Sequence, residues 1–298
     1  MRPVVPRVAA LHDLSGFGRT SLTVVIPILS AMGAQVCPLP TALLSTHTVE
    51  FTGYTLLDLT DEMGRVLDHW ERLGLRFEAV YSGFMACPRQ MDHVARCIER
   101  CLAPGGLAVV DPVLGDNGVL DPTMTPDMVA RMRWLVSRAQ VITPNFTEAA
   151  FLLNEPCRER IAPDELRRWL HRLRAMGPET VVITSVPMSD DPHCLSVAAA
   201  ENDSQSSAAR MWQIDSVHIP VHYPGTGDAF ASVLTGSLLA GDSLPIAMDR
   251  AVQFVSMGIR ATCDHKLPTR EGIVLESILG DLRAPLRASH TMPLEAGV

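Results

Sequence analysis

A glycine-rich turn leads straight into an apolar helical segment in the stretch HYPGTGDAFASVLTG, residues 222–236. Gly225 and Gly227 permit a backbone in which successive amides converge on one anion, and the amino end of the following helix adds positive charge. With Thr226 between them, they would stabilise charge that develops on a transferring phosphoryl group. Asp228 then suits a general base that takes the proton of an attacking hydroxyl, and we expect the helix terminus to keep it ionised near neutral pH. The alternative is an ordinary helix cap.

Two further motifs place acids directly after apolar strands. DPVLGD carries Asp111 and Asp116 around a proline turn, and TPNFTEA carries Asn145 and Glu148 where a helix begins. Mg²⁺ prefers oxygen ligands, often one or two carboxylates together with substrate phosphates and water. These acids therefore suit a magnesium site. Each also has a structural interpretation. In the first motif these are a capping Asp and a solvated loop Asp. In the second, Asn145 and Thr147 are candidates for a helix cap, and Glu148 lies in the first turn, where the helix dipole favours an acid and a capping role is equally open.

The turn GFGRTS, residues 16–21, contains half of the glycine fingerprint of dinucleotide-binding proteins. The full fingerprint also needs an acid at the end of the second strand. The chain has no Asp or Glu between Asp13 and Glu50, which argues against a nicotinamide or flavin cofactor. The glycines then indicate a tight turn between a strand and a helix. Asp13 lies at the tip of an apolar strand, where we expect it to bind ligand.

The composition excludes several classes of protein. The chain has 298 residues and a net charge of −8, which argues against a nucleic-acid partner, because such proteins normally carry a basic face. Its single lysine, Lys266, lies in none of the glycine turns, so a Walker A loop and a protein-kinase strand lysine are both ruled out. The seven cysteines form no CxxC pair, and no apolar stretch is long enough to span a membrane. We expect a cytoplasmic protein with no membrane partner.

Strands and helices alternate along most of the chain, which predicts an α/β fold with a parallel sheet covered by helices on both faces. After residue 185 two strands flank a polar tip and indicate an antiparallel hairpin, and three helices follow. We expect one domain over residues 1–285 and a poorly ordered tail over 286–298. The predicted strands are 7–13, 34–41, 77–83, 106–113, 140–145, 180–185, 193–200 and 209–219, and the predicted helices are 21–33, 61–74, 88–103, 125–139, 163–177, 228–241, 245–261 and 271–282.

The ends of the parallel strands carry most of the polar residues that could do chemistry. In open α/β sheets, ligands bind outside the carboxyl ends of the strands. We therefore expect the site to be formed by the segments that follow the strands: Asp13, 41–48, 82–84, 111–116, 143–145 and 184–185.

Taken together, these motifs resemble a known family. GTGDAFASVLTG is similar to the signature of the ribokinase-like superfamily, and DPVLGD, TPNFTEA and VITS follow in the order and spacing of its pyridoxal and pyridoxamine kinase branch. HDLSGFGRTS, CPLPTALLSTHT and YSGFM agree with that branch, so the resemblance covers residues 8–262. It implies a three-layer α/β/α sandwich that transfers phosphate from ATP to the 5′-hydroxymethyl group of a B6 vitamer. It also implies Mg²⁺, a monovalent cation such as K⁺ near the anion hole, and a homodimer.

The resemblance also implies a role for each matching residue. Asp228 would be the base, beside an anion hole of Gly225, Thr226 and Gly227. The remaining assignments are Asp111, Asp116 and Glu148 on the metal side, Asn145, Thr184 and Ser185 near ATP, Asp13, His47, Thr48 and Phe84 near the vitamer, and the adenine between residues 217–221 and 252–261.

The chain departs from the family pattern at three places. Many members have serine-histidine where this chain has His12 and Asp13, and a tyrosine where it has Phe84. An Asp could still pair with a ring nitrogen or the phenolic oxygen of a vitamer, and Phe84 retains ring stacking without a hydroxyl. The loop over residues 187–192 is short and acidic. These differences leave the preferred vitamer open.

Three other interpretations compete. Sugar kinases of the superfamily carry an amino-terminal Gly-Gly-Asn pattern that this chain lacks. Hydroxymethylpyrimidine kinases are closer, but many have cysteine at the position of Asp228, so the acid favours a B6 kinase. A homologue that binds a vitamer without catalysis is the third alternative, and the intact set of acids argues against it.

Overall fold

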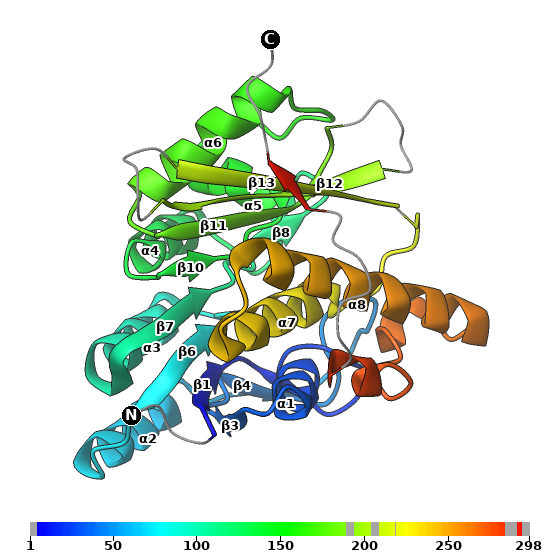
Figure 1. Ribbon diagram of the computed structural model, residues 1–298. Helices are drawn as coiled ribbons and strands as arrows, with labels where there is room; N and C mark the ends of the chain where they lie inside the picture. Colours follow the sequence, from blue (N-terminus) through cyan, green and yellow to red (C-terminus); the bar gives the residue numbers. More distant parts are fainter. Residues whose placement is uncertain (1–4, 189–193, 204–208, 218, 284–290, 294–298) are drawn as a thin grey trace.

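The computed structural model describes residues 5–188, 194–203, 209–217, 219–283 and 291–293. These residues form a nine-stranded sheet with the order β14-β13-β12-β11-β10-β7-β6-β1-β3 (Figure 1). The strands from β11 to β3 run parallel, and β12, β13 and β14 continue the sheet antiparallel. The bounds are β1 (Arg7–Leu11), β3 (Gln35–Pro38), β6 (Phe77–Ser82), β7 (Leu102–Val110), β10 (Val141–Ile142), β11 (Thr180–Val186), β12 (Cys194–Asn202), β13 (Ala209–Val217) and β14 (Met292–Pro293).

Helices cover both faces of this sheet. In β11, Val181 and Ile183 belong to one apolar core and Val182 belongs to the other, as the twofold repeat of a strand requires. The first core is closed by α2 (Thr60–Arg72), α3 (Pro88–Cys101), α4 (Pro126–Val136), α5 (Phe146–Leu153) and α6 (Pro163–Ala175), and the second by α1 (Leu22–Ala31), α7 (Thr226–Ala240) and α8 (Leu244–His265). The predicted three-layer α/β/α sandwich is confirmed.

The antiparallel hairpin is also present, with Cys194 to Asn202 of β12 paired to β13 in continuous register. Most of its predicted polar tip lies outside the described residues. In the carboxyl-terminal segment, Met292 and Pro293 pair with Gln213 and Trp212 of β13. The division into a domain over 1–285 and a tail over 286–298 stays a prediction.

Two small sheets lie beside the main one where the sequence indicated only loops. One joins β2 (Leu14–Ser15), β4 (Ala42–Leu44) and β5 (Leu56–Asp58), and the other joins β8 (Gly115–Asp116) and β9 (Val119–Leu120). Both follow carboxyl ends of strands, β1 and β7. They therefore shape the edge at which the predicted site residues gather.

The predicted helix over residues 271–282 is wrong. The structure has only two short 3-10 turns there, η1 (Thr269–Glu271) and η2 (Leu279–Arg283). Between them, Gly272 has a φ of 77°, Ile273 is buried in the second core, and Val274 donates its N–H to Thr262 Oγ1 at 2.8 Å. The Val274 N–H thus bonds to α8 and not within a helix of its own, and the Ile273 side chain is buried in the second core.

Candidate active site

The predicted site residues come from one edge of the molecule. Asp13 follows β1, Phe84 follows β6, Asp111 follows β7, and Asn145 follows β10. These strands are parallel neighbours, so their carboxyl ends meet along one edge of the sheet. Asp228 lies in the first turn of α7, on the face that carries α1 and α8. Segments more than 200 residues apart therefore contribute to one site.

The Asp228 carboxyl group is held by a backbone amide. Its Oδ2 accepts a hydrogen bond from the Ser21 N–H at 2.8 Å, and its Oδ1 lies 3.9 Å from His12 Nδ1. Burial raises the pKa of Asp228 to about 7, the Ser21 amide acts against that shift, and the nearby Asp13 adds to it. The expectation that Asp228 stays ionised near neutral pH holds only in part, because burial outweighs the helix terminus. A pKa near 7 still suits a general base.

Ser21 is a residue that the sequence analysis missed. Its N–H donates to Asp228, and its hydroxyl donates to Asp13 Oδ1 at 2.5 Å. Ser21 therefore joins the base to Asp13, the residue predicted to bind the vitamer. Its φ of 51° is unusual for a residue with a side chain, and such strain is typical of functional sites. Burial raises the pKa of Asp13, and hydrogen bonds from Ser21 and Ser15 oppose the rise. A serine directly before the first helix was the available signal.

The glycine turn before α7 packs tightly on the first glycine turn. Gly225 has a φ of 82°, and a Cβ there would lie 2.1 Å from the Arg19 carbonyl oxygen. Gly227 faces open space, because a Cβ there would meet nothing within 4 Å. Thr226 donates its hydroxyl to the Tyr223 carbonyl at 3.0 Å, which leaves its amide for other contacts. The first amides of a helix have no intrahelical acceptor, so this turn can hold an anion.

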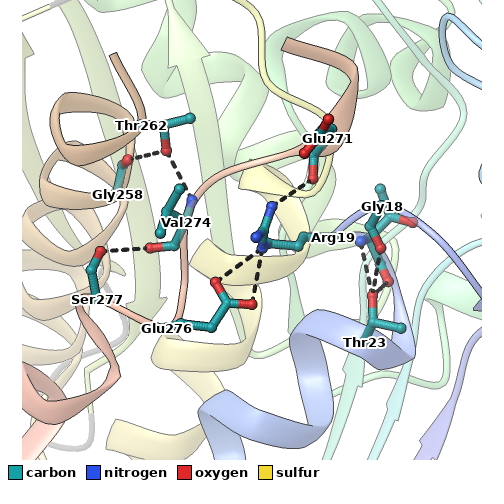
Figure 2. Close-up of polar contacts among 10 residues, drawn as sticks. Gly18, Arg19, Thr23, Gly258, Thr262, Glu271, Val274, Glu276 and Ser277 are labelled. Atoms are coloured by element: carbon teal, nitrogen blue, oxygen red, sulfur yellow. Dashed lines mark hydrogen bonds and ion pairs between the residues drawn. The ribbon is translucent and has the colours of Figure 1, made fainter. Parts of the chain in front are cut away.

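Arg19 ties the first glycine turn to the segment after α8 (Figure 2). Its N–H and its Nη1 donate to the Glu271 carbonyl at 3.0 and 3.2 Å, and its Nε lies 3.1 Å from a Glu276 carboxyl oxygen. The Glu276 side chain is 68% exposed, so this ion pair contributes less than about 1 kcal/mol. Figure 2 also shows Thr262, which donates to the Gly258 carbonyl at 2.6 Å and accepts from the following segment. These contacts set the position of the turn that carries Ser21.

Glu148 and Asn145 form a capping box at the start of α5. Glu148 Oε2 accepts the Asn145 N–H at 2.8 Å, and Asn145 Oδ1 accepts the Glu148 N–H at 2.9 Å. Glu148 Oε1 accepts the Leu114 N–H at 3.0 Å, and the Asn145 amide donates to the Gly115 carbonyl at 2.8 Å. The structure thus bears out the capping interpretation of both residues. Their roles near metal and ATP stay predictions.

The acids on the predicted metal side repel one another. Burial raises the pKa of Asp111 well above its usual range, and the charges of Glu148 and Asp228 raise it further. Burial likewise raises the pKa of Glu148 to about 7, with backbone amides acting against the shift and Asp116 adding to it. Asp116 is exposed and lies 3.7 Å from His222 Nδ1.

The donor set fits a magnesium ion that arrives with phosphate. In the described part of the chain, no three His, Cys, Asp or Glu side chains are grouped closely enough to hold a metal by themselves. Mg²⁺ commonly binds through one or two carboxylates, with phosphates and water as the other ligands. A cation beside Asp111 would also relieve the repulsion between the buried acids. The residues present therefore fit Mg²⁺ bound together with a nucleotide.

Thr184 and Ser185 end β11 beside Asn145. The Thr184 N–H donates to the Pro144 carbonyl at 3.0 Å, and an isolated bridge joins Thr184 to Asn145. Ser185 is exposed and has a φ of 57°. Of the predicted adenine region, residue 218 lies outside the described residues, as do residues 189–192 of the acidic loop. The contacts of all these residues with ATP stay predictions.

The residues predicted to bind the vitamer differ in their contacts and exposure. His47 Nε2 lies 2.6 Å from the Arg270 carbonyl, and its Nδ1 accepts the Val49 N–H at 3.2 Å. Both ring nitrogens are thus occupied, which assigns the proton to Nε2, and the buried ring meets Phe51 with the ring centroids 4.9 Å apart. Thr48 is exposed, and Phe84 packs partly buried against the first core.

Two hollows elsewhere do not belong to this site. One, of about 380 Å³, is lined by residues such as His171 and Arg210, and the other, of about 430 Å³, by Gly105 and Gln140 among others. Arg210 pairs across the sheet with Glu201, which is aligned with the first residue of β11. Both hollows thus lie at the amino ends of the parallel strands, opposite Asp228.

Comparison with known proteins identifies the family. A family profile described as phosphomethylpyrimidine kinase matches residues 28–273. The chain belongs to the phosphomethylpyrimidine kinase family. A Bacteroides thetaiotaomicron protein of that description, crystallised with pyridoxal, is 49% identical, with a TM-score of 0.92 over 97% of this chain and 99% of that chain. For pyridoxal kinase from Lactobacillus plantarum the identity is 32% and the TM-score 0.83, over 94% and 97% of the two chains.

A third relative comes from Bordetella avium. Its pyridoxine/pyridoxal/pyridoxamine kinase is 29% identical over 266 residues, which cover 88% of this chain and 87% of that one. The predicted resemblance to ribokinase-like kinases of the pyridoxal branch is confirmed. Within the described residues, no helix of this family member is long and apolar enough to cross a membrane.

Proposed function

We propose that the protein transfers the γ-phosphoryl group of ATP to the 5′-hydroxymethyl group of a B6 vitamer. The observation that carries this proposal is the placement of Asp228 at the start of α7, behind the Gly225–Gly227 turn and joined to Asp13 through Ser21. A base and an anion site side by side suit phosphoryl transfer to an alcohol. The Bacteroides thetaiotaomicron protein crystallised with pyridoxal supports a vitamer as the acceptor.

The geometry divides the reaction between the two parts of the turn. Asp228 takes the proton of the acceptor hydroxyl while that oxygen forms a bond to the γ-phosphorus, and the bond from phosphorus to the bridging oxygen of ATP breaks. The amides of Thr226 and Gly227 stabilise the charge on the transferring group. Asp228 with a pKa of about 7 can both accept this proton and return it to solvent after turnover.

Cations complete the proposed site. Asp111 would hold Mg²⁺ through its carboxylate, with Asp116 and Glu148 behind it. When bound, Mg²⁺ would neutralise charge on the phosphates. A monovalent cation such as K⁺ near the anion hole is a further proposal that rests on the family resemblance.

Substrate contacts follow from the same edge of the sheet. We place the ATP phosphates against Asn145, Thr184 and Ser185, and the vitamer against four residues of the segments that follow other strands. These are Asp13, His47, Thr48 and Phe84.

A hydroxymethylpyrimidine is the second candidate acceptor, because the family profile that matches residues 28–273 is described as phosphomethylpyrimidine kinase. Both candidates present a hydroxymethyl group on a nitrogen heterocycle, so Asp228 could serve either. Asp13 can pair with a protonated ring nitrogen in both.

One assay separates these candidates. Purified protein is given Mg-ATP with pyridoxal, pyridoxamine, pyridoxine or hydroxymethylpyrimidine, and ADP release and phosphorylated product are measured. Turnover of a vitamer at least tenfold above that of the pyrimidine supports the proposal. Binding of pyridoxal without ADP release would contradict it, and preference for the pyrimidine would favour the second candidate. Asp228→Asn should reduce turnover to a small residual rate, whereas the control Asp264→Asn removes an exposed acid and should leave turnover unchanged.

We also propose a homodimer. Leu43 of β4 and Leu57 of β5 stand opposite each other in the small sheet, and their exposed fractions are 45% and 57%. Apolar pairs of this kind are typical of surfaces that bind a second copy. Light scattering should give twice the chain mass, and Leu57→Lys should lower it. A wild-type protein with the mass of one chain would contradict the proposal.

A cytoplasmic location suits this function. All seven cysteines are reduced in the structure, as expected in a compartment that keeps thiols reduced and supplies ATP.

A further inference from the structure

A histidine lies buried directly beneath the proposed base. His12 follows β1, has no exposed surface, and meets the Tyr81 ring edge-on with the ring centroids 4.4 Å apart. Gly83 lies against the Nδ1 edge of the ring, because a Cβ there would lie 2.4 Å from His12 Nδ1. The site is therefore shaped around an imidazole ring.

Neither nitrogen of this ring makes a hydrogen bond of ordinary geometry within the described residues, although the main chain of Tyr81 interacts with the ring and raises its pKa. The hydroxyls of Tyr81 and Ser232 are buried nearby, and the Ser232 hydroxyl interacts with that of Tyr81 and lowers its pKa. Buried polar groups are almost always hydrogen-bonded in folded proteins, so an unpaired imidazole next to a catalytic carboxyl group calls for a functional explanation.

The unpaired nitrogen faces the carboxyl oxygen that Ser21 does not hold. Ser21 binds Asp228 Oδ2 at 2.8 Å, whereas Asp228 Oδ1 lies 3.9 Å from His12 Nδ1. This separation is about 1 Å longer than a hydrogen bond. Closing it would require the carboxyl group to turn toward His12 while Oδ2 keeps the Ser21 N–H.

We propose that His12 is a positioning residue for Asp228, and that its neutral imidazole accepts the hydrogen of the protonated carboxyl group through Nδ1. This inference rests on the proposed phosphoryl transfer. As the new oxygen–phosphorus bond forms, the acceptor hydroxyl loses its proton to Asp228 Oδ1. That proton stays on the carboxyl oxygen and is shared with His12 Nδ1, so the base is stabilised in the state it reaches during the reaction.

The surroundings keep His12 neutral. Burial lowers the pKa of the imidazole to about 3, and the main chain of Tyr81 acts in the opposite sense. The ionisable groups nearby are the Tyr81 phenol, Asp13 beside it in the chain, and Asp228, while Asp111 acts on Tyr81. A neutral ring carries one N–H donor and one acceptor nitrogen, and the proposed role uses the tautomer in which Nδ1 is the acceptor.

Three substitutions test the inference. His12→Asn places an amide oxygen near the position of Nδ1, His12→Gln places its amide near Nε2, and His12→Leu fills the space without an acceptor. With saturating ATP and pyridoxal, His12→Leu should lose about tenfold in kcat with little change in KM, the worth of one hydrogen bond made in the transition state. His12→Asn should recover most of that loss, and His12→Gln should not.

The same experiment separates this inference from the proposed function. If the wild-type protein phosphorylates a vitamer but His12→Leu retains kcat within twofold, the role of His12 is refuted and the function stands. Equal losses in the Asn and Gln variants would also refute it. If the wild-type protein phosphorylates no vitamer, the proposed function fails first. In an Asp228→Asn background, His12→Leu should cause no further loss in the residual rate, and each variant's thermal unfolding reports its fold.

Discussion

Replacing Asp228 by Asn should stabilise the folded protein while it removes most of the activity. Burial raises the pKa of this group from its ordinary value of 3.8 to about 7. The folded protein therefore binds this proton more tightly than the unfolded chain does. Between these two pKa values, stability falls as the pH rises, and the loss is complete above the folded pKa. Asn removes the ionisation and keeps an oxygen that can accept the Ser21 N–H.

The size of the effect follows from the shift. One pKa unit corresponds to about 1.4 kcal/mol, so the penalty carried by Asp228 grows by roughly 3 kcal/mol between pH 5 and pH 8. The side chain remains 15% exposed, so this is an upper figure. The stability gain of Asp228→Asn over the wild type should thus be larger at pH 8 than at pH 5 by about 1–3 kcal/mol.

Urea unfolding of the unliganded protein at the two pH values measures this difference. The control Asp264→Asn removes an exposed acid of the same kind and should show nearly the same stability difference at both pH values. An Asp228→Asn variant whose advantage does not grow with pH would show that Asp228 is already ionised at pH 5. The reasoning that burial sets the pKa of the base would then be refuted.

Three further predictions concern the turns and acids around the base. Gly225→Ala should lower the free energy of unfolding by more than about 2 kcal/mol, because of its φ of 82° and the clash with Arg19. Gly227→Ala, which meets nothing within 4 Å, should unfold like the wild type in the same urea titration. Ser21→Ala keeps the backbone N–H that binds Asp228 but loses the hydroxyl that donates to Asp13, the residue predicted to bind the vitamer. Steady-state kinetics should therefore show KM for pyridoxal raised about tenfold. An unchanged KM would contradict that assignment. Glu148→Gln should raise the Mg²⁺ concentration that gives half-maximal rate several-fold. An unchanged concentration would mean that Glu148 serves only as a helix cap.

Much of the fold could be predicted because it depends on local pattern. The central strands are apolar on both faces, and the helices between them repeat apolar residues at helical spacing, so their order alone predicted a parallel sheet covered on both sides. The segment over residues 271–282 has a similar apolar pattern and is not a helix. Its Val274 amide and Ile273 side chain bind α8 and the second core, and such competition with distant residues leaves no local signal.

The sequence by itself determined the chemical parts of the site and their strand ends: a glycine turn with Asp228 at a helix start, and acids after apolar strands. These follow from backbone freedom at glycine and from the geometry of parallel sheets, which are short-range properties. Only the tertiary structure decided that Asp228 has a pKa near 7, that Ser21 joins it to Asp13, and that His12 lies unpaired beneath it. The physical reason is that burial and hydrogen-bond partners depend on residues some 200 positions away, which no local pattern encodes.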